Sequence, residues 1–182
     1  MIYRFLILSD EVDNFRREIK IDADNTFYDL YQIITDCTGF NDKEMASFFV
    51  CGDNWRKKEE ITLVEMDTDS DEDSFVMNET ILSDLLEDEK QKLMFVFDFL
   101  NDRALYIELS EIISEKSLKK PMCTISHGEA PLQVKSPEDI AAESTISDMG
   151  EVFYGDEDYD PDELDQEGFE GLDDLSLDLE NY

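Results

Sequence analysis

A run of apolar residues at positions 92–99 restricts the fold of this chain more than any other segment. It reads Lys-Leu-Met-Phe-Val-Phe-Asp-Phe, and Asp98 is its only acidic residue. Strands that are buried on both faces are continuous apolar runs rather than strict alternations. A turn sequence follows at 100–103, and a second apolar run occupies 104–109. We therefore predict a central strand that leads into a hairpin, with Phe95 and Phe97 on one side, Val96 on the other, and all three buried.

The N-terminal segment predicts a second β-hairpin. Residues 2–9 are mostly apolar, and residues 10–14 have the composition of a turn. Residues 15–21 then alternate, with Phe15, Ile19 and Ile21 on one face and charged residues on the other. This alternation is typical of a half-buried antiparallel strand.

A helix is expected after this hairpin, because Asp24, Asn25 and Thr26 supply N-cap residues and Gly39 supplies a C-terminal stop. Apolar residues recur between them at helical spacing: Phe27, Leu30, Tyr31 and Ile34. Residues 45–52 and 60–66 predict two further strands, and residues 67–73 an acidic loop. Residues 80–86 predict a short helical turn, capped by Asn78 or Thr80.

The order of these elements is that of the β-grasp, or ubiquitin-like, architecture. We therefore predict an α+β fold with a mixed sheet and one main helix, followed by an extra C-terminal hairpin and an acidic tail. The first strand and the central strand should lie side by side and parallel, joined by right-handed crossovers. The strand at 104–109 leaves two alternatives open. Either it displaces the strand at 45–52, or the chain bends near Leu100 into a second layer.

The charge of the chain excludes some functions. There are 48 acidic and 15 basic residues, which give a net charge of −33, while hydrophobic residues make up 41% and suffice for a core. Such a surface repels nucleic acids and anionic membranes, and it favours basic partners, divalent cations or simply solubility. We expect no direct binding of duplex DNA at physiological salt.

The three cysteines, Cys37, Cys51 and Cys123, are widely spaced and odd in number. Neither a disulfide framework nor a zinc site is indicated. The apolar N-terminus is too short for a signal-peptide core, and no other stretch is long enough to span a bilayer. A reducing cytoplasmic location is therefore expected.

Four short motifs, in this order, resemble those of one protein family. Residues 15–19 (Phe-Arg-Arg-Glu-Ile) resemble its W-R-R-hydrophobic strand, and residues 26–30 (Thr-Phe-Tyr-Asp-Leu) its T-L-x-D-L-H helix start. Residues 97–102 (Phe-Asp-Phe-Leu-Asn-Asp) resemble its Y-D-F-G-D-x-W strand and turn. Residues 121–123 with 128–131 resemble its Y-P-x-C … G-x-x-A-P-P-E-D segment. The family is that of the plasmid pRi open-reading-frame-three-like proteins.

The resemblance covers about residues 1–131, and the chain departs from the pattern at three points. Leu100 stands at the turn glycine, the turn tryptophan has no match, and Leu132-Gln133 stand at the acidic pair. Some members are described as passenger proteins of insertion elements and carry a resolvase-like label. The resemblance implies no established reaction and no catalytic residue.

The composition shifts after the domain, which we place at residues 1–135. Ser136 and Pro137 begin a predicted short helix or linker at 136–146. Residues 147–182 contain fifteen acidic residues, no lysine and no arginine, with aromatic and leucine residues interleaved. This alternation is typical of a flexible segment that docks on a partner.

Catalytic and metal motifs are weak. Cys123 and the only histidine, His127, are four residues apart, a spacing that favours a structural interpretation over a nucleophile–base pair. No glycine-rich phosphate loop and no nucleophile elbow occur.

One group of acidic residues has a spacing like that of an EF-hand calcium loop. Its members match positions 1, 3, 5 and 12 of such a loop: Asp156, Asp158, Asp160 and Glu167. Pro161 occupies the position at which that loop needs glycine, so only weak divalent binding is predicted.

Two basic clusters are candidate interaction sites: Arg16 and Arg17, and Arg56, Lys57 and Lys58 beside Trp55. They are interpreted either as solvated surface or as a surface on which the acidic tail docks.

We predict a non-enzymatic binding domain without a cofactor, whose partner is a basic protein surface or, through the tail, its own domain. Two alternatives remain. One is a mobile-element accessory protein that imitates the charge of DNA, and the other is an enzyme of unrecognised type.

Overall fold

The computed structural model describes residues 1–64, 75–114 and 116–135. These residues belong to one unit, Met1–Ser136. The predicted loop at 67–73, the helix at 136–146 and the acidic tail lie outside the described residues. No helix in the described ranges has the length and apolar character needed to cross a membrane. The elements are β1 (Ile2–Leu8), β2 (Arg16–Asp22), α1 (Phe27–Thr38), β3 (Ser47–Cys51), β4 (Lys57–Thr62), β5 (Phe75–Val76), α2 (Leu82–Leu85), β6 (Lys92–Asp98), β7 (Arg103–Ile113) and β8 (Met122–His127).

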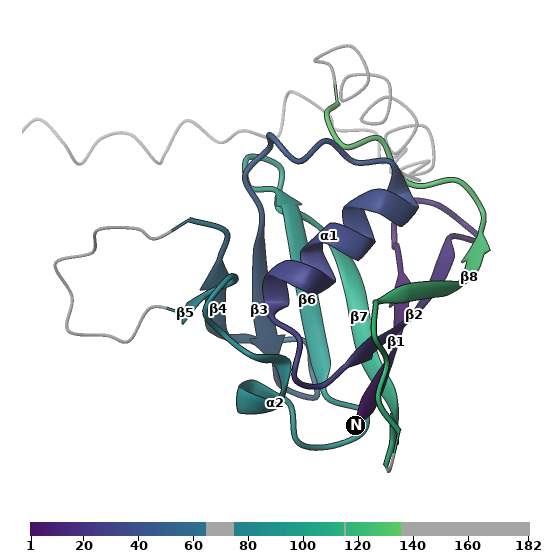
Figure 1. Ribbon diagram of the computed structural model, residues 1–182. Coiled ribbons are helices and arrows are strands. Elements are labelled where there is room, and N and C mark those ends of the chain that lie inside the picture. Colours follow the sequence, from purple (N-terminus) through teal and green to yellow (C-terminus); the bar gives the residue numbers. More distant parts are fainter. Residues whose placement is uncertain (65–74, 115, 136–182) are drawn as a thin grey trace, which may run out of the picture. The chain divides into compact units, whose positions relative to one another are not determined.

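The described strands form one open eight-stranded sheet in the order β5-β4-β3-β6-β7-β1-β2-β8. All neighbours are antiparallel except β4 and β5, which are parallel. Helix α1 lies across one face of this sheet (Figure 1). The fold is therefore α+β with a mixed sheet and one main helix, as the sequence predicts.

The predicted parallel pairing of the first strand with the central strand is wrong. Strand β7 lies between β1 and β6 and pairs antiparallel with both. The physical reason is the short turn between β6 and β7, which returns the chain directly alongside β6. Neither predicted alternative for this strand holds, because β3 remains on the other side of β6 and β7 stays in the same layer. The insertion also brings the start of β7 close to the turn between β1 and β2.

The central position of residues 92–98 is confirmed. Strand β6 has β3 on one side and β7 on the other. Phe95, Val96 and Phe97 are 1%, 1% and 3% exposed. Phe95 and Phe97 belong to the core cluster beneath α1, and Val96 does not.

Helix α1 begins and ends where the sequence predicts. Thr26 is the N-cap, and its hydroxyl and the Asp29 carboxylate form a reciprocal capping box. Gly39 ends the helix with a φ of 78°, which a residue with a β-carbon rarely adopts. Phe27 and Tyr31 pack against Phe48 and Phe95 with ring centroids 5.6 and 6.0 Å apart, so this helix face closes the core.

Other boundaries differ from the prediction. Strand β4 starts at Lys57 rather than residue 60, and β7 continues to Ile113 rather than residue 109. The sequence analysis does not predict strands β5 and β8. Neither Asn78 nor Thr80 caps α2, because Ile81 is its N-cap and the Thr80 hydroxyl donates to the Val76 carbonyl.

Candidate functional site

The turn between β6 and β7 is held by the side chain of Asp98. One carboxylate oxygen accepts the backbone N–H groups of Leu100 (3.1 Å) and Asn101 (3.2 Å), and the other accepts the Asn101 side-chain amide (2.7 Å). Such turns are a common use of aspartate. Asp102, with a φ of 50°, carries the positive dihedral of this turn, and Leu100 does not. Leucine therefore fits at the position where the family pattern has glycine.

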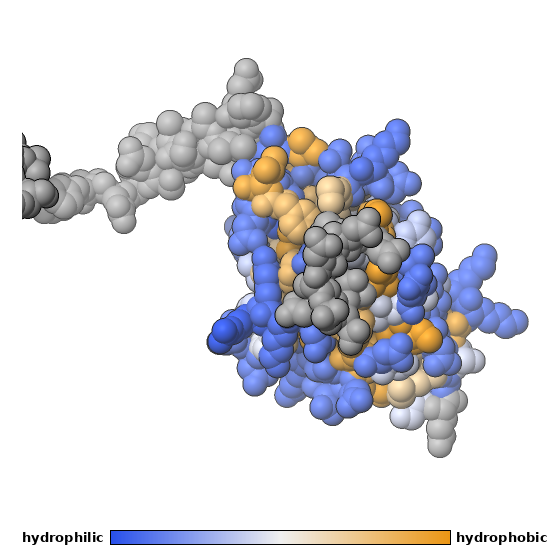
Figure 2. Space-filling model, turned by 90° about the vertical axis from the view of Figure 1, so that its left-hand side faces the viewer, coloured by the Kyte–Doolittle hydropathy of each residue, from blue (hydrophilic) through white to orange (hydrophobic). Residues whose placement is uncertain are grey.

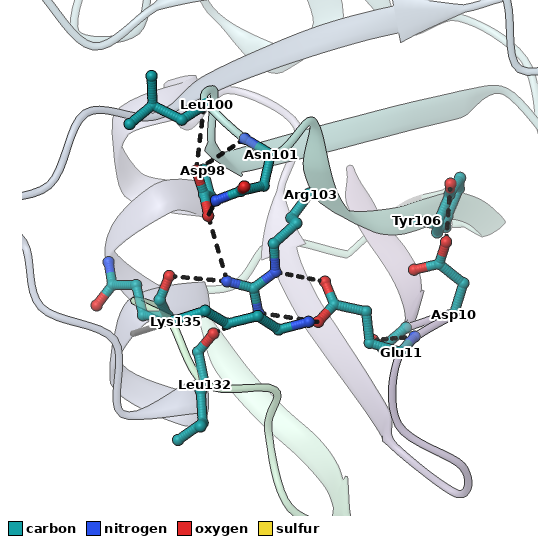
Figure 3. Close-up of polar contacts among 11 residues, drawn as sticks. Asp10, Glu11, Asp98, Leu100, Asn101, Arg103, Tyr106, Leu132 and Lys135 are labelled. Carbon is teal, nitrogen blue, oxygen red and sulfur yellow. Dashed lines mark hydrogen bonds and ion pairs between the residues drawn. The ribbon is translucent and has the colours of Figure 1, made fainter. Parts of the chain in front are cut away.

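Arg103 lies directly beneath this turn and is 7% exposed. Its guanidinium donates two parallel hydrogen bonds to Glu11, at 2.8 and 2.9 Å, and a longer one of 3.4 Å to Asp98. It also donates to the backbone carbonyls of Leu132 and Gln133 (Figure 3). All five guanidinium N–H groups are used, so Arg103 joins three segments that are distant in sequence.

The carboxylates around Arg103 are held in their ionised form. Burial alone would raise the pKa of Glu11, but hydrogen bonds from Arg103 and Lys135 outweigh it and hold that pKa below its usual value. Burial likewise opposes the hydrogen bonds from Asn101 and Arg103, which together lower the pKa of Asp98. Lys135 lies 3.0 Å from Glu11 and completes the charge pairing.

Large apolar side chains are exposed above this polar base. Five of them define what we call the apolar end: Met45 (65% exposed), Phe99 (46%), Leu100 (97%), Leu132 (63%) and Val134 (66%). Four of them, all but Leu132, line a pocket of about 420 Å³, together with Phe97 and Lys135. Figure 2 shows hydrophobic side chains gathered at the upper end of the molecule, where Figure 1 places the β6–β7 turn.

The first predicted basic cluster is divided between surface and interior. Arg16 is exposed, but Arg17 is only 5% exposed. Its guanidinium donates to the backbone carbonyls of Cys37 (3.0 Å), Arg16 (3.0 Å), His127 (2.6 Å) and Gly128 (3.0 Å). Four of its five N–H groups are therefore used inside the domain, and Arg17 does not offer them to a tail or partner.

The second predicted cluster lies on the other half of the sheet. Arg56, Lys57 and Lys58 are exposed at the start of β4, and β4 and β2 are separated by four strands. Trp55 is half-buried with a φ of 61°, and its ring meets Tyr106 edge-on at 5.0 Å. The ring contacts of Trp55 are with Tyr106 and Lys92, and the structure does not join the two basic clusters into one surface.

The thiols of Cys37 and Cys51 are not activated, because burial raises the pKa of each. The pKa of Cys37 is raised to about 12, first by burial and then by the neighbouring Cys123. A thiol must ionise to act as a nucleophile, so this shift favours a structural interpretation. The Cys123 thiol donates to the Ile125 carbonyl at 3.1 Å, and His127 lies at the opposite end of β8.

Metal binding by the predicted acidic spacing falls outside the described part of the chain, since Asp156, Asp158, Asp160 and Glu167 are not described. Within the described ranges, no group of three or more His, Cys, Asp or Glu side chains is placed to hold a metal ion.

Nearly the whole chain, from residue 2 to residue 179, matches the family described as plasmid pRiA4b ORF-3-like protein. The chain belongs to this family. The match extends well beyond residue 131, where the quoted motifs end, and includes most of the acidic segment. No curated protein matches the sequence.

A solved structure with a similar fold comes from Methanosarcina mazei Go1 and is a protein of unknown function. It is 16% identical to this family member, with a TM-score of 0.59, and the match covers 85% of this chain and 84% of that one. At this identity the likeness concerns the fold alone.

Proposed function

We propose that this domain binds a protein partner at its apolar end and acts by binding rather than by catalysis. The observation that carries the proposal is the exposure of Leu100 and Val134, at 97% and 66%, beside a pocket of about 420 Å³. Single exposed apolar residues are ordinary, but contiguous apolar patches on a soluble domain mark interaction sites.

The rigidity of the base supports this role. Leu100 and Phe99 sit on a turn that Asp98 fixes from within, and Arg103 fixes Asp98 and the carbonyl of Gln133. A preorganised surface loses little conformational entropy when a partner binds. The turn therefore presents Phe99 and Leu100 to an incoming chain from a backbone that is already fixed.

The polar groups of the site do not favour acid–base catalysis. A general acid or base works best with a pKa near the operating pH. The pKa values of Glu11 and Asp98 are instead lowered. The N–H groups of Arg103 are all used within the domain, which leaves none for a substrate.

The charge of the chain selects the partner. Glu44 lines the same pocket, the Asp102 side chain is 80% exposed, and the net charge of the whole chain is −33. Complementary charge steers association and excludes acidic competitors. The expected partner is a basic protein segment with apolar anchor residues, a chemistry that DNA-binding proteins share.

Selection from a random-peptide display library against the full-length protein tests this proposal. We expect selected peptides to combine lysine or arginine with large apolar residues. Leu100→Glu and Val134→Glu should each weaken their binding about tenfold or more, because each places a charge within the apolar contact. Both positions are exposed, so neither change should unfold the domain.

Val64→Glu is the matched control, because Val64 is 65% exposed and does not line the pocket. Its binding should equal that of the unmodified protein. If no peptide is selected, or if Val64→Glu weakens binding as much as Leu100→Glu, the apolar end is not the binding surface.

A further inference from the structure

A second pocket, of about 330 Å³, lies along α1 and adjoins the apolar end. Asn41 lines this pocket and Gln133 lines the first one, and the two residues are joined by a pair of hydrogen bonds. Phe40 also belongs to this wall, and its ring lies 4.9 Å from Phe97 in the first pocket. A segment bound at the apolar end therefore has a second pocket next to it.

The hydroxyl of Tyr31 is unpaired at this pocket. Tyr31 is 3% exposed and lines the pocket, and its hydroxyl has no hydrogen-bond partner among the described residues. Buried polar groups nearly always have a partner, so an exception calls for a reason. A ligand group within the pocket that donates a hydrogen bond to this oxygen would supply the missing partner.

The other walls of the pocket are aromatic and acidic. The ring of Tyr28 stacks on that of Tyr31, with centroids 5.8 Å apart and planes 29° apart. Asp36 and Asp42 are exposed at the rim and form no ion pair with any described residue. Asp42 and Tyr31 line the same pocket, and burial, followed by the charges of Asp42 and Tyr28, raises the pKa of Tyr31.

We propose that this pocket binds a guanidinium or ammonium group, namely an arginine or lysine side chain of the partner. Tyrosine faces attract cations, carboxylates accept their N–H groups, and the Tyr31 oxygen is a further acceptor. The assignment of the cation to the partner's side chain rests on the proposed function, because that function predicts a basic partner. The prediction that the pocket binds a cation is independent of the proposed function.

Titration of the full-length protein with N-acetyl-arginine amide, followed by NMR, tests the pocket directly. We expect saturable shifts at Tyr31 and Asn41. The citrulline analogue, which has the same shape without the charge, should bind about tenfold more weakly or not at all. Asp42→Asn should weaken arginine binding by a similar factor, and Tyr31→Phe by less.

The controls separate binding from folding. Tyr31→Phe removes a hydroxyl that has no partner, so its thermal unfolding should match that of the unmodified protein. Asp84→Asn changes a carboxylate in α2 that does not line the pocket, and it should leave arginine binding unchanged. Equal binding of the arginine and citrulline amides, or equal loss in Asp84→Asn and Asp42→Asn, would overturn the proposal.

Failure of this inference is distinguishable from failure of the proposed function. If arginine amide binds but no displayed peptide does, the proposed cation pocket is supported and the proposed binding of a basic protein partner is wrong. If peptides bind and replacing their arginines and lysines by citrulline does not weaken them, the partner's side chain is not the cation and that part of the proposal is wrong.

Discussion

Two buried arginines, Arg17 and Arg103, are held in opposite ways. Arg103 is surrounded by the carboxylates of Glu11 and Asp98, with two backbone carbonyls in addition. Arg17 is held by four backbone carbonyls, and its guanidinium lies 4.5 Å from the ring of Phe15. One arginine is neutralised by opposite charge, and the other is solvated by peptide dipoles.

The difference shows how each arginine depends on its surroundings. The Cys37 carbonyl belongs to the last turn of α1, where the helix dipole favours a cation. Carbonyls do not titrate, so the contacts of Arg17 persist at any pH at which the domain is folded. Carboxylates do titrate, so the contacts of Arg103 beneath the apolar end depend on pH.

The largest effect is expected for Arg103→Met, which keeps the apolar bulk of the side chain. It removes the partner of two partly buried carboxylates, and breaking a buried pair in this way costs about 3–5 kcal/mol. Urea unfolding at neutral pH measures this cost. A loss below about 1 kcal/mol would show that water replaces the arginine without penalty.

Arg17→Met should destabilise the domain less. It leaves carbonyls rather than charges without a partner, at about 2–3 kcal/mol in total once some of them have bonded to water. The same urea experiment provides the comparison. A cost greater than that of Arg103→Met would reverse the ranking of the two sites.

Glu11→Gln should cost about 1–2 kcal/mol, because one acceptor oxygen remains but the charge that faces Arg103 is lost. Glu111→Gln is the matched control: Glu111 pairs with Arg4 at 2.9 Å, but its side chain is 43% exposed. Exposed pairs contribute little, so this control should stay within about 0.5 kcal/mol of the unmodified protein. Equal costs for the two variants would argue that burial does not matter to the Glu11 pair.

The smallest expected effect is a difference in how the stability contributions of Arg103 and Arg17 change at acidic pH. The folded pKa values of Glu11 and Asp98 are lowered from their usual 4.5 and 3.8, so their contribution is complete above those values. It is lost as the pH falls through the lower folded values. The stability gap between the unmodified protein and Arg103→Met should therefore narrow below about pH 4, whereas the gap to Arg17→Met should not. Urea unfolding at several acidic pH values measures both gaps, and parallel narrowing would contradict the assignment.

The alternation of the strands carries a signal for both arginines that the prediction did not use. In β2, Arg17 has the parity of Phe15, Ile19 and Ile21, so a period of two places it on the core face. In β7, Arg103 has the parity of Leu105 and likewise faces inward. The burial of an arginine that alternates in phase with core residues can be predicted from the sequence. Its hydrogen-bond partners cannot be predicted, because they come from distant segments.

The other elements of the fold and of the site can be predicted from the sequence only in part. The central strand, the first hairpin and the ends of α1 follow from local patterns. The insertion of β7 depends on which distant strands pair, and β8 has neither strong alternation nor a continuous apolar run. Leu100 and Val134 lie in loops, so the sequence suggests that their apolar side chains are exposed. That both line one pocket depends on the fold and cannot be predicted from local sequence.

The position of β7 also sets the order in which the chain can fold. Strand β1 pairs with β2, its immediate successor, but its other neighbour spans Arg103–Ile113. At a synthesis rate of about 5–20 residues per second, the N-terminal hairpin waits roughly 5–20 s on the ribosome before that neighbour is made. During this interval Tyr3, Phe5 and Ile7, which are buried in the finished sheet, lack their β7 partners. The nascent hairpin therefore exposes these apolar side chains until β7 is made, and this is the interval in which the unfinished chain is prone to aggregate.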